Sequence, residues 1–159
     1  MLRLVPMTET EFLGYSKNSI EHYAQEHVKA GNWHPSDAVL KAQKEFQELL
    51  PEGVSSKNQY IFTIEDDQAD LKIGMIWFAV RDNGLHRSAF IYDFIIDEQY
   101  RKQGYGMQTL IALEIKARVL GIDTISLHVF GHNHAAIALY QKAGYEITNL
   151  HMAKKLGIS

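Results

Sequence analysis

Residues 97–106, with the sequence DEQYRKQGYG, connect a segment that predicts a β-strand to one that predicts an α-helix. A turn from strand to helix leaves the first N–H groups of the helix without partners, beside the positive end of the helix dipole. Glycine at Gly104 and Gly106 lets the backbone come close to a ligand, so that these N–H groups can surround a phosphate. Arg101 and Lys102 add positive charge at the same place. The stretch therefore predicts an anion site, for a phosphate or a pyrophosphate.

Two familiar phosphate-binding patterns do not fit this turn. A P-loop has Gly-Lys followed by Ser or Thr, which this stretch lacks, and a dinucleotide fingerprint has a third glycine where this chain has Thr109. Taken alone, a helix start with two turn glycines and no ligand explains the turn equally well.

The segments before the turn are typical of an antiparallel sheet. Residues 60–64, 71–80 and 88–96 are apolar runs rich in strand-forming residues. Gly74 is a candidate β-bulge. Residues 82–84, Asp-Asn-Gly, predict a hairpin because Asn and Gly tolerate the positive φ of such turns. We expect three consecutive antiparallel strands.

Helices are predicted at the N-terminal end of the chain. Thr8 and Glu11 have the spacing of a capping box, which predicts a helix over 8–31. A second helical periodicity covers 36–50 and ends at a proline.

The C-terminal half returns to helical periodicity over 104–120 and 133–142, with an apolar strand at 124–129 between them. A final strand is predicted from Tyr145 onward, which implies a parallel crossover joined to the antiparallel strands. We expect a mixed α/β (α+β) fold in one domain over 1–159, with a central, mostly antiparallel sheet flanked by helices.

The bulk composition narrows the class of protein. The chain has 159 residues, a net charge of −3 and no cysteine, which excludes disulfides, thiolate metal sites and a cysteine nucleophile. The charge predicts no nucleic-acid partner. Neither a signal peptide nor an apolar run of about 20 residues is found, so we expect a cytoplasmic protein without a membrane partner. His132 and His134 are interpreted as solvated loop residues, and no metal site is predicted.

A second motif lies about thirty residues after the turn. Residues 133–145 read NHAAIALYQKAGY, with Asn133 at a natural N-cap position and Tyr140 seven residues later on almost the same face. The order R-x-x-G-x-G, then N-x-x-A-x-x-L-Y-x-x-x-G-Y, resembles the GNAT superfamily of N-acetyltransferases. The resemblance is specific over residues 90–145.

The resemblance implies acetyl-CoA as cosubstrate and a role for each matched residue. The backbone of 101–106 would hold the CoA pyrophosphate, 94–96 would pair with the pantetheine arm, and one of their N–H groups would polarise the thioester carbonyl. Asn133 would bind the cofactor arm, and Tyr140 would protonate the departing thiolate; a core aromatic and a plain N-cap are the alternatives. The implied cofactor contacts are Phe94, Ile95, Ile96, Arg101, Lys102, Gln103, Gly104, Tyr105, Gly106, Asn133 and Tyr140.

The general base is harder to assign. An amine is mostly protonated at neutral pH, and many family members use a glutamate on the fourth strand, which is absent here. Strand alternation puts Phe90, Tyr92 and Phe94 on one face and Asp93 on the other, so Asp93 is a candidate only if a bulge or splay re-aims it. His128 is the second candidate. A structural role for either residue, and a water chain in place of a base, are the alternatives.

The resemblance implies direct attack of a primary amine on acetyl-CoA without a covalent enzyme intermediate. The acceptor is a small amine or a protein amino group, in a pocket expected from 23–33, 60–67 and the C-terminal strand. A non-catalytic acyl-CoA sensor and a nucleotide-binding protein of another fold are the alternative functions. Many relatives form dimers, so a homodimer is compatible with the resemblance.

Overall fold

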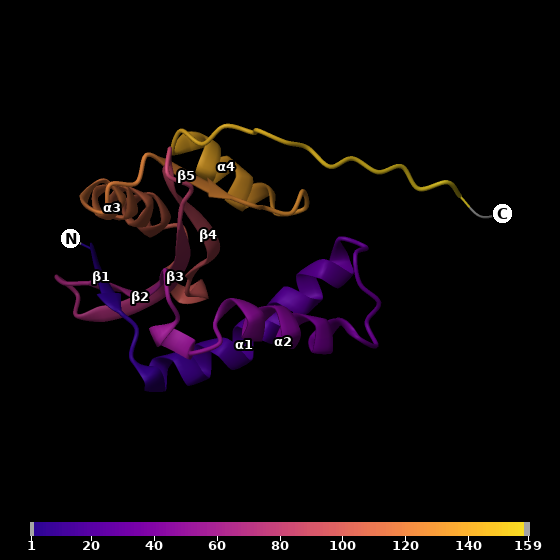
Figure 1. The fold of residues 1–159 in the computed structure, drawn as a ribbon, viewed down its shortest axis with the longest axis horizontal. Helices are drawn as coiled ribbons and strands as arrows, with labels where there is room; N and C mark the ends of the chain where they lie inside the picture. The colour runs from indigo at the N-terminus through magenta and orange to yellow at the C-terminus, as the bar shows by residue number, and fades with distance from the viewer. Residues whose placement is uncertain (1, 158–159) are drawn as a thin grey trace.

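The computed structural model describes residues 2–157, which form one five-stranded sheet with helices on both faces (Figure 1). The strands lie in the order β1-β2-β3-β4-β5. The first three pairings are antiparallel and the pairing of β4 with β5 is parallel, which confirms a mixed, mostly antiparallel sheet. Their bounds are β1 Leu2–Pro6, β2 Gln59–Asp66, β3 Leu71–Asp82, β4 Arg87–Ile96 and β5 Thr124–Leu127.

Two helices lie against each face of the sheet (Figure 1). α1 (Glu9–Lys29) and α2 (Ala38–Leu49) cover one face, and α3 (Tyr105–Val119) and α4 (His134–Lys142) cover the other. Short 3₁₀ turns, η1 (Gly53–Ser55) and η2 (Glu98–Tyr100), follow α2 and β4. Each pair of helices encloses its own apolar cluster, and the cluster under α3 and α4 is the larger. No helix within 2–157 is long and apolar enough to cross a membrane.

Local sequence signals account for several element boundaries. The capping box at the start of α1 is formed: Glu11 N–H donates to Thr8 Oγ1 at 3.2 Å, and Thr8 N–H donates to Glu11 Oε1 at 3.0 Å. In α3, the predicted apolar stripe buries Leu110, Leu113 and Ala117 against the sheet. The predicted helices are therefore confirmed to within a few residues at each end.

The predicted hairpin and bulge are also confirmed. β3 and β4 are joined by a turn in which Gly84 has φ +87° and Asn83 Oδ1 accepts the N–H groups of Leu85 and His86. The β2–β3 register shifts beside Gly74. A Cβ at Gly74 would lie 2.0 Å from the carbonyl oxygen of Ile95, so the close approach of β4 requires glycine there.

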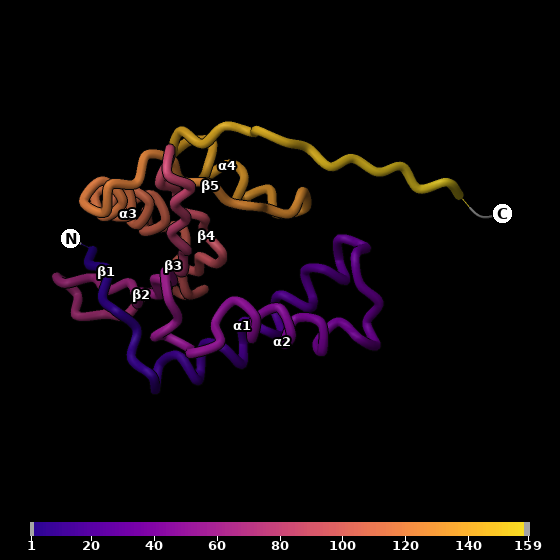
Figure 2. Tube along the Cα trace, viewed as in Figure 1, coloured from indigo at the N-terminus to yellow at the C-terminus, as the bar shows by residue number. Residues whose placement is uncertain are grey.

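Two sequence-based expectations about the ends of the chain are corrected. β1 was not predicted, although it pairs with β2 over its whole length. The final strand predicted from Tyr145 onward is wrong, because residues 146–157 join no sheet and run away from the body in an extended path (Figure 2). The predicted strand at 124–129 is also shorter, since β5 ends at Leu127. Apolar alternation shows that a segment suits a strand, but a strand forms only where a partner edge is available.

Candidate active site

β4 and β5 pair over only part of β4, which opens a gap in the sheet. The parallel ladder joins Ser88–Ile91 to Thr124–Leu127 and stops there. The remaining residues of β4, Tyr92–Ile96, have no partner on β5, and the chain after Leu127 is no longer a strand. Backbone hydrogen-bonding groups at this opening are therefore available to an extended ligand.

A bulge in β4 decides which side chains point toward α1. Trp77 is opposite Asp93 while its neighbour Phe78 is opposite Ile91, so Tyr92 is an extra residue in β4. Tyr92 packs in the cluster under α1 and α2, and Asp93 hydrogen-bonds to α1. The bulge thus places two successive side chains on one face.

Strand alternation alone gave a different arrangement, which the bulge corrects. Phe94 packs in the cluster under α3 and α4, so it does not share a face with Phe90 and Tyr92, whose rings are 4.9 Å apart. Re-aiming by a bulge was the condition under which Asp93 is a candidate base. The structure meets that condition.

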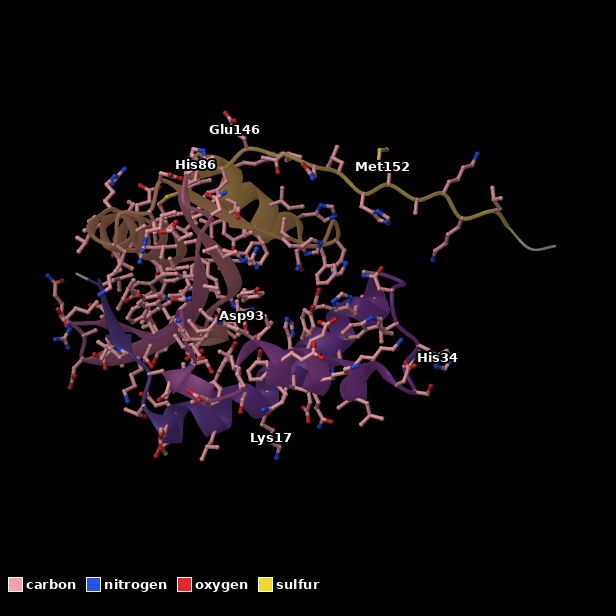
Figure 3. All side chains as sticks on the ribbon, viewed as in Figure 1. Lys17, His34, His86, Asp93, Glu146 and Met152 are labelled. Carbon is pink, nitrogen blue, oxygen red and sulfur yellow. The ribbon has the colours of Figure 1, made fainter. Side chains whose placement is uncertain are left out.

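Asp93 lies in a polar cluster between β4 and α1, at the centre of the molecule (Figure 3). Tyr15 Oη donates to Asp93 Oδ2 at 2.7 Å, and Ser19 Oγ donates to the same oxygen at 3.1 Å. The N–H of Phe94 donates to Oδ1 at 3.0 Å. Burial raises the pKa of the Asp93 carboxyl, and the hydrogen bonds together with the charge of His22 only partly offset this effect. A carboxyl group with a raised pKa accepts a proton more readily than an exposed one.

Tyr140 approaches the same region from the other face of the sheet. Its ring, on α4, packs 6.5 Å from that of Phe94 and 5.5 Å from that of Tyr145. Burial raises the pKa of the Tyr140 phenol, with smaller contributions from Tyr145 and from the charge of Asp93. The phenol is therefore protonated throughout the neutral range, as a proton donor must be.

The turn before α3 has the features of an anion site. Gly104 is the N-cap of α3 with φ +84°, and no side chain caps the helix. No acidic residue occurs in the first turn, and Lys102 also has positive φ, +62°. Arg101 is partly fixed, because its Nε donates to the carbonyl oxygen of Ile96 at 2.7 Å. The free N–H groups at this helix start suit a phosphate.

Gly106 and Tyr105 have structural roles that the sequence did not reveal. A Cβ at Gly106 would lie 2.9 Å from Leu139 Cδ2, so this glycine allows α3 to pack closely on α4. The Tyr105 hydroxyl donates to Asp66 Oδ2 at 2.8 Å, which leaves its backbone N–H as the group free to meet a ligand. Gln103 likewise uses its side chain within the turn, donating to the carbonyl oxygen of Gln99 at 3.3 Å.

Comparison with known proteins identifies this arrangement. The model of the acetyltransferase (GNAT) family matches residues 20–145. The chain belongs to the GNAT family. YycN of Bacillus subtilis, an N-acetyltransferase, is 40% identical over 155 residues, which are 98% of this chain and 99% of YycN. The crystal structure of YycN covers 99% of this chain and 100% of its own, with a TM-score of 0.94 and 39% identity.

Two further relatives carry the same activity in their names. YdgE of B. subtilis, also an N-acetyltransferase, is 35% identical over 153 residues, 96% of this chain and 97% of YdgE. The spermidine N(1)-acetyltransferase of Vibrio cholerae is 32% identical over 103 residues, 64% of this chain and 57% of that protein. This GNAT chain is therefore an acyltransferase of the N-acetyltransferase class.

The loop before α4 is tied to α1 by a buried carboxylate that sequence reasoning missed. Glu26 Oε2 accepts a hydrogen bond from His132 Nε2 at 2.5 Å and is 3.5 Å from Asn133 Nδ2. His22, one turn earlier on α1, is 3.8 Å from the other oxygen. Asn133 is thus at the N-cap position of α4, but its side chain makes no capping hydrogen bond and faces Glu26 instead. His132 is exposed in the loop, as expected, but its side chain also hydrogen-bonds to Glu26 in this cluster.

His128 has a different environment from Asp93. It follows the end of β5, is exposed, and its ring packs 5.0 Å from that of Phe130. None of the hydrogen bonds among residues 2–157 joins it to Asp93 or Tyr140. The structure of this GNAT chain therefore groups Asp93, not His128, with the cluster on α1.

The segments expected to line an acceptor pocket are only partly at the opening. α1 contributes Tyr15, Ser19 and Glu26 to the face toward β4 and the loop before α4. Residues 60–67 lie on β2 and its end, which β3 separates from β4. Their acidic turn is already paired, since Arg3 bonds Glu65 and Asp67.

A regular spacing on α1 was the signal that could have revealed this polar face. Tyr15, Ser19, His22 and Glu26 follow one another at intervals of four, three and four residues, which is one face of a helix. Ser19 and Glu26 are buried, which is unusual for such residues without a role.

Proposed function

We propose that this enzyme transfers the acetyl group of acetyl-CoA directly to a primary amine, with Asp93 as general base and Tyr140 as general acid. The observation that carries the proposal is the position of these two groups. Asp93 lies on the α1 side of β4, just beyond the last residue of β4 that pairs with β5, and Tyr140 packs against the neighbouring Phe94 on the other face of the sheet.

The residues around the opening fit acetyl-CoA, which would supply the acetyl thioester. The uncapped N-terminus of α3, with Lys102 and Arg101 beside it, would hold the pyrophosphate through backbone N–H groups. The unpaired part of β4, Phe94–Ile96, would pair with the extended pantetheine arm, and one of its N–H groups would bind the thioester oxygen. Asn133 would contact the same arm after leaving Glu26.

The two proton transfers would then take place on opposite faces of the sheet. Asp93, whose pKa is raised by burial, would take the proton of the attacking amine directly or through water. The phenol of Tyr140 would give its proton to the departing sulfur. No covalent bond to the protein is required, in agreement with the absence of cysteine.

The acceptor is proposed as an amine that enters between α1 and β5. The carboxyl groups of half-buried Asp93 and buried Glu26 lie on this side and favour a cationic acceptor, and the V. cholerae relative is named for spermidine. A small polyamine is therefore the first acceptor to test, with a protein amino group as the second. We propose that residues 1–159 form one acetyltransferase domain that acts in the cytoplasm, a reducing compartment in which disulfides are rare.

The test is release of CoA from acetyl-CoA in the presence of an amine panel. The panel contains polyamines, aminoglycosides, amino acids, and peptides with a free N-terminus or lysine. Acceptor-dependent release, together with a product one acetyl group heavier by mass spectrometry, is expected. Binding of CoA by calorimetry without turnover of any amine would instead favour an acyl-CoA sensor and contradict the proposal.

A further inference from the structure

Aromatic side chains gather where the end of α1 meets the loop before α4 (Figure 1). The rings of His27 and Trp33 are stacked 4.0 Å apart, and the Tyr23 ring stands nearly perpendicular to both, at 4.6 Å and 5.6 Å. From the loop before α4, the Phe130 ring approaches His27 at 5.1 Å, again nearly perpendicular. We call these four residues, Tyr23, His27, Trp33 and Phe130, the aromatic corner. Tyr23 is 38% exposed, so part of the corner can meet a ligand.

A carboxylate from α2 borders the aromatic corner. Glu45 Oε2 accepts a hydrogen bond from the Tyr23 hydroxyl at 2.8 Å. Its other oxygen, Oε1, takes part in no hydrogen bond or ion pair within residues 2–157. Glu26, by contrast, already accepts a hydrogen bond from His132. Half-buried Glu45 therefore offers a free acceptor oxygen beside the rings.

The aromatic corner suits a cation better than a neutral apolar group. Burial lowers the pKa of the His27 imidazole, and the charge of Glu45 only partly offsets this effect, so the ring is neutral at pH 7. His27 Nδ1 lies 3.0 Å from the amide nitrogen of Asn32, a donor, which agrees with a neutral ring. The faces of aromatic rings attract an ammonium group, and a neighbouring carboxylate adds to the attraction.

The aromatic corner lies further along α1 than the contacts of the proposed base. Ser19 donates to Asp93, and Tyr23 and His27 follow Ser19 by about 6 and 12 Å along the helix axis. Burial raises the pKa of the Tyr23 phenol, with smaller contributions from Glu45 and from Tyr92, the neighbour of Asp93 in β4. An acceptor with one amine at Asp93 can therefore reach the corner with a second amine, if several carbon atoms separate the two.

We propose that Glu45 and the aromatic corner form a second subsite, which binds the distal ammonium group of a linear diamine or polyamine while its other amine reacts at Asp93. This inference rests on the proposed function, because Asp93 defines the reacting end of the acceptor. Glu45 Oε1 pairs with the distal ammonium group, and the rings cover its methylene neighbours. Glu45 takes no part in the proton transfers; it selects acceptors by their second charge and their length.

The first experiment compares kcat/KM for diaminoalkanes of increasing length with kcat/KM for the alkylamines that lack the second amine. At the best length the wild type is expected to prefer the diamine by roughly tenfold or more. Glu45→Gln is expected to remove most of this preference and to leave kcat/KM for the alkylamine unchanged. Glu48→Gln, at an exposed position of the same helix, is the control and is expected to change neither value. Equal losses for diamine and alkylamine in Glu45→Gln would overturn the subsite.

The second experiment separates the ring of Tyr23 from its hydroxyl. Tyr23→Phe keeps the ring and is expected to keep the preference for diamines, whereas Tyr23→Leu removes the ring and is expected to lower it several-fold. Thermal unfolding of both variants checks that each is folded. Equal preferences in Tyr23→Phe and Tyr23→Leu would contradict the contribution of the ring.

Binding measurements distinguish failure of the subsite from failure of the proposed function. Calorimetry in the presence of CoA, which carries no acetyl group to transfer, compares each diamine with its alkylamine on the wild type and on Glu45→Gln. Tighter binding of the diamine, lost in Glu45→Gln, supports the subsite even if no amine is acetylated, in which case only the proposed function fails. Equal affinity for the two ligands, or binding of neither, would overturn the subsite, whatever the turnover of the alkylamines.

Discussion

Asp93 is a carboxyl group whose burial and hydrogen bonds act in opposite directions. Removal from water favours the protonated form, whereas the donors Tyr15, Ser19 and the N–H of Phe94 favour the ionised form. Burial is the larger effect, so the pKa is raised. A general base works best when its pKa lies near the working pH, because the group is then still largely ionised and also binds a proton strongly.

The pH dependence of turnover tests this role at a single residue. Asp93→Asn is expected to lower kcat/KM by roughly 100-fold or more, and to remove the rise of activity with pH that ionisation of Asp93 produces. His128→Gln is the control and is expected to keep that rise, because His128 is exposed and outside the cluster. The assignment fails if His128→Gln removes the pH dependence and Asp93→Asn keeps it.

The sequence identified Asp93 as a candidate but not the groups that control it. Tyr15 and Ser19 lie 78 and 74 positions away in the chain, and no local pattern connects such distant residues. The orientation of Asp93 also depends on a bulge opposite Trp77, which leaves no mark in the residues of β4 themselves. The sequence shows that a carboxyl group is present at position 93, whereas the direction of its side chain follows from the pairing of β3 with β4.

At the scale of elements, the contact between α3 and α4 depends on a glycine. Gly106→Ala is expected to destabilise the protein by up to about 1 kcal/mol, because the new methyl group would lie 2.9 Å from Leu139 Cδ2, and the shift of that side chain outweighs the helix propensity that alanine adds. Gly14→Ala, in the exposed middle of α1 with nothing within 4 Å, is the matched control and is expected to stabilise by about 0.5–1 kcal/mol. Urea denaturation of both variants measures the change in unfolding free energy, which is expected to have opposite signs. Equal changes in the two variants would contradict the packing role of Gly106.

The tie between α1 and the loop before α4 is a second contact between elements. Glu26→Gln removes the charge that His132 and His22 face in a buried position. The expected loss is about 1.5–3 kcal/mol of unfolding free energy, the range for a hydrogen bond to a charged group. Glu21→Gln, on an exposed part of the same helix, is expected to change the stability by less than about 0.5 kcal/mol. A loss of the same size in both variants would show that the tie is not stabilising.

The order of helices and strands could be predicted well from the sequence, but which segments pair as strands in the sheet could not. Capping boxes, turn glycines and apolar periods act over a few residues, so α1, α3 and the β3–β4 hairpin were predicted close to their observed bounds. β1 is only five residues long and ends at a proline, and it forms because β2 offers an edge. Residues 146–157 also carry apolar side chains, yet they pair with no strand among the described residues.

At the scale of the whole molecule, the buried Asp93 links stability to pH. Its pKa in the folded state is above the ordinary value of 3.8, so the folded protein binds this proton more tightly than the unfolded chain. The contribution of Asp93 is therefore fully present below pH 3.8 and is lost as the pH rises through the folded-state pKa. The unfolding free energy of the wild type minus that of Asp93→Asn is expected to fall from acidic to neutral pH. A difference that rises with pH would mean that the pKa is lowered instead.

The architecture as a whole places Asp93 and Tyr140, the proposed proton acceptor and proton donor, on opposite faces of one sheet, near the point where β4 and β5 separate. The order of motifs in the sequence predicted both the fold and the transferase class, and the family match over 20–145 confirms them. The roles of Asp93 and Tyr140 in the reaction are the central claim, and Tyr140 is its more direct test.

The measurement to make is steady-state acetyl transfer by Tyr140→Phe beside Tyr145→Phe, with the affinity for CoA measured on both. The first variant is expected to lose roughly 100-fold or more in kcat while its CoA affinity changes little, since it lacks only the proton donor. Tyr145→Phe removes a buried hydroxyl that has no hydrogen-bond partner among the described residues, so its kcat is expected to stay near the wild-type value. Equal kcat values for Tyr140→Phe and the wild type would contradict the proposed general acid.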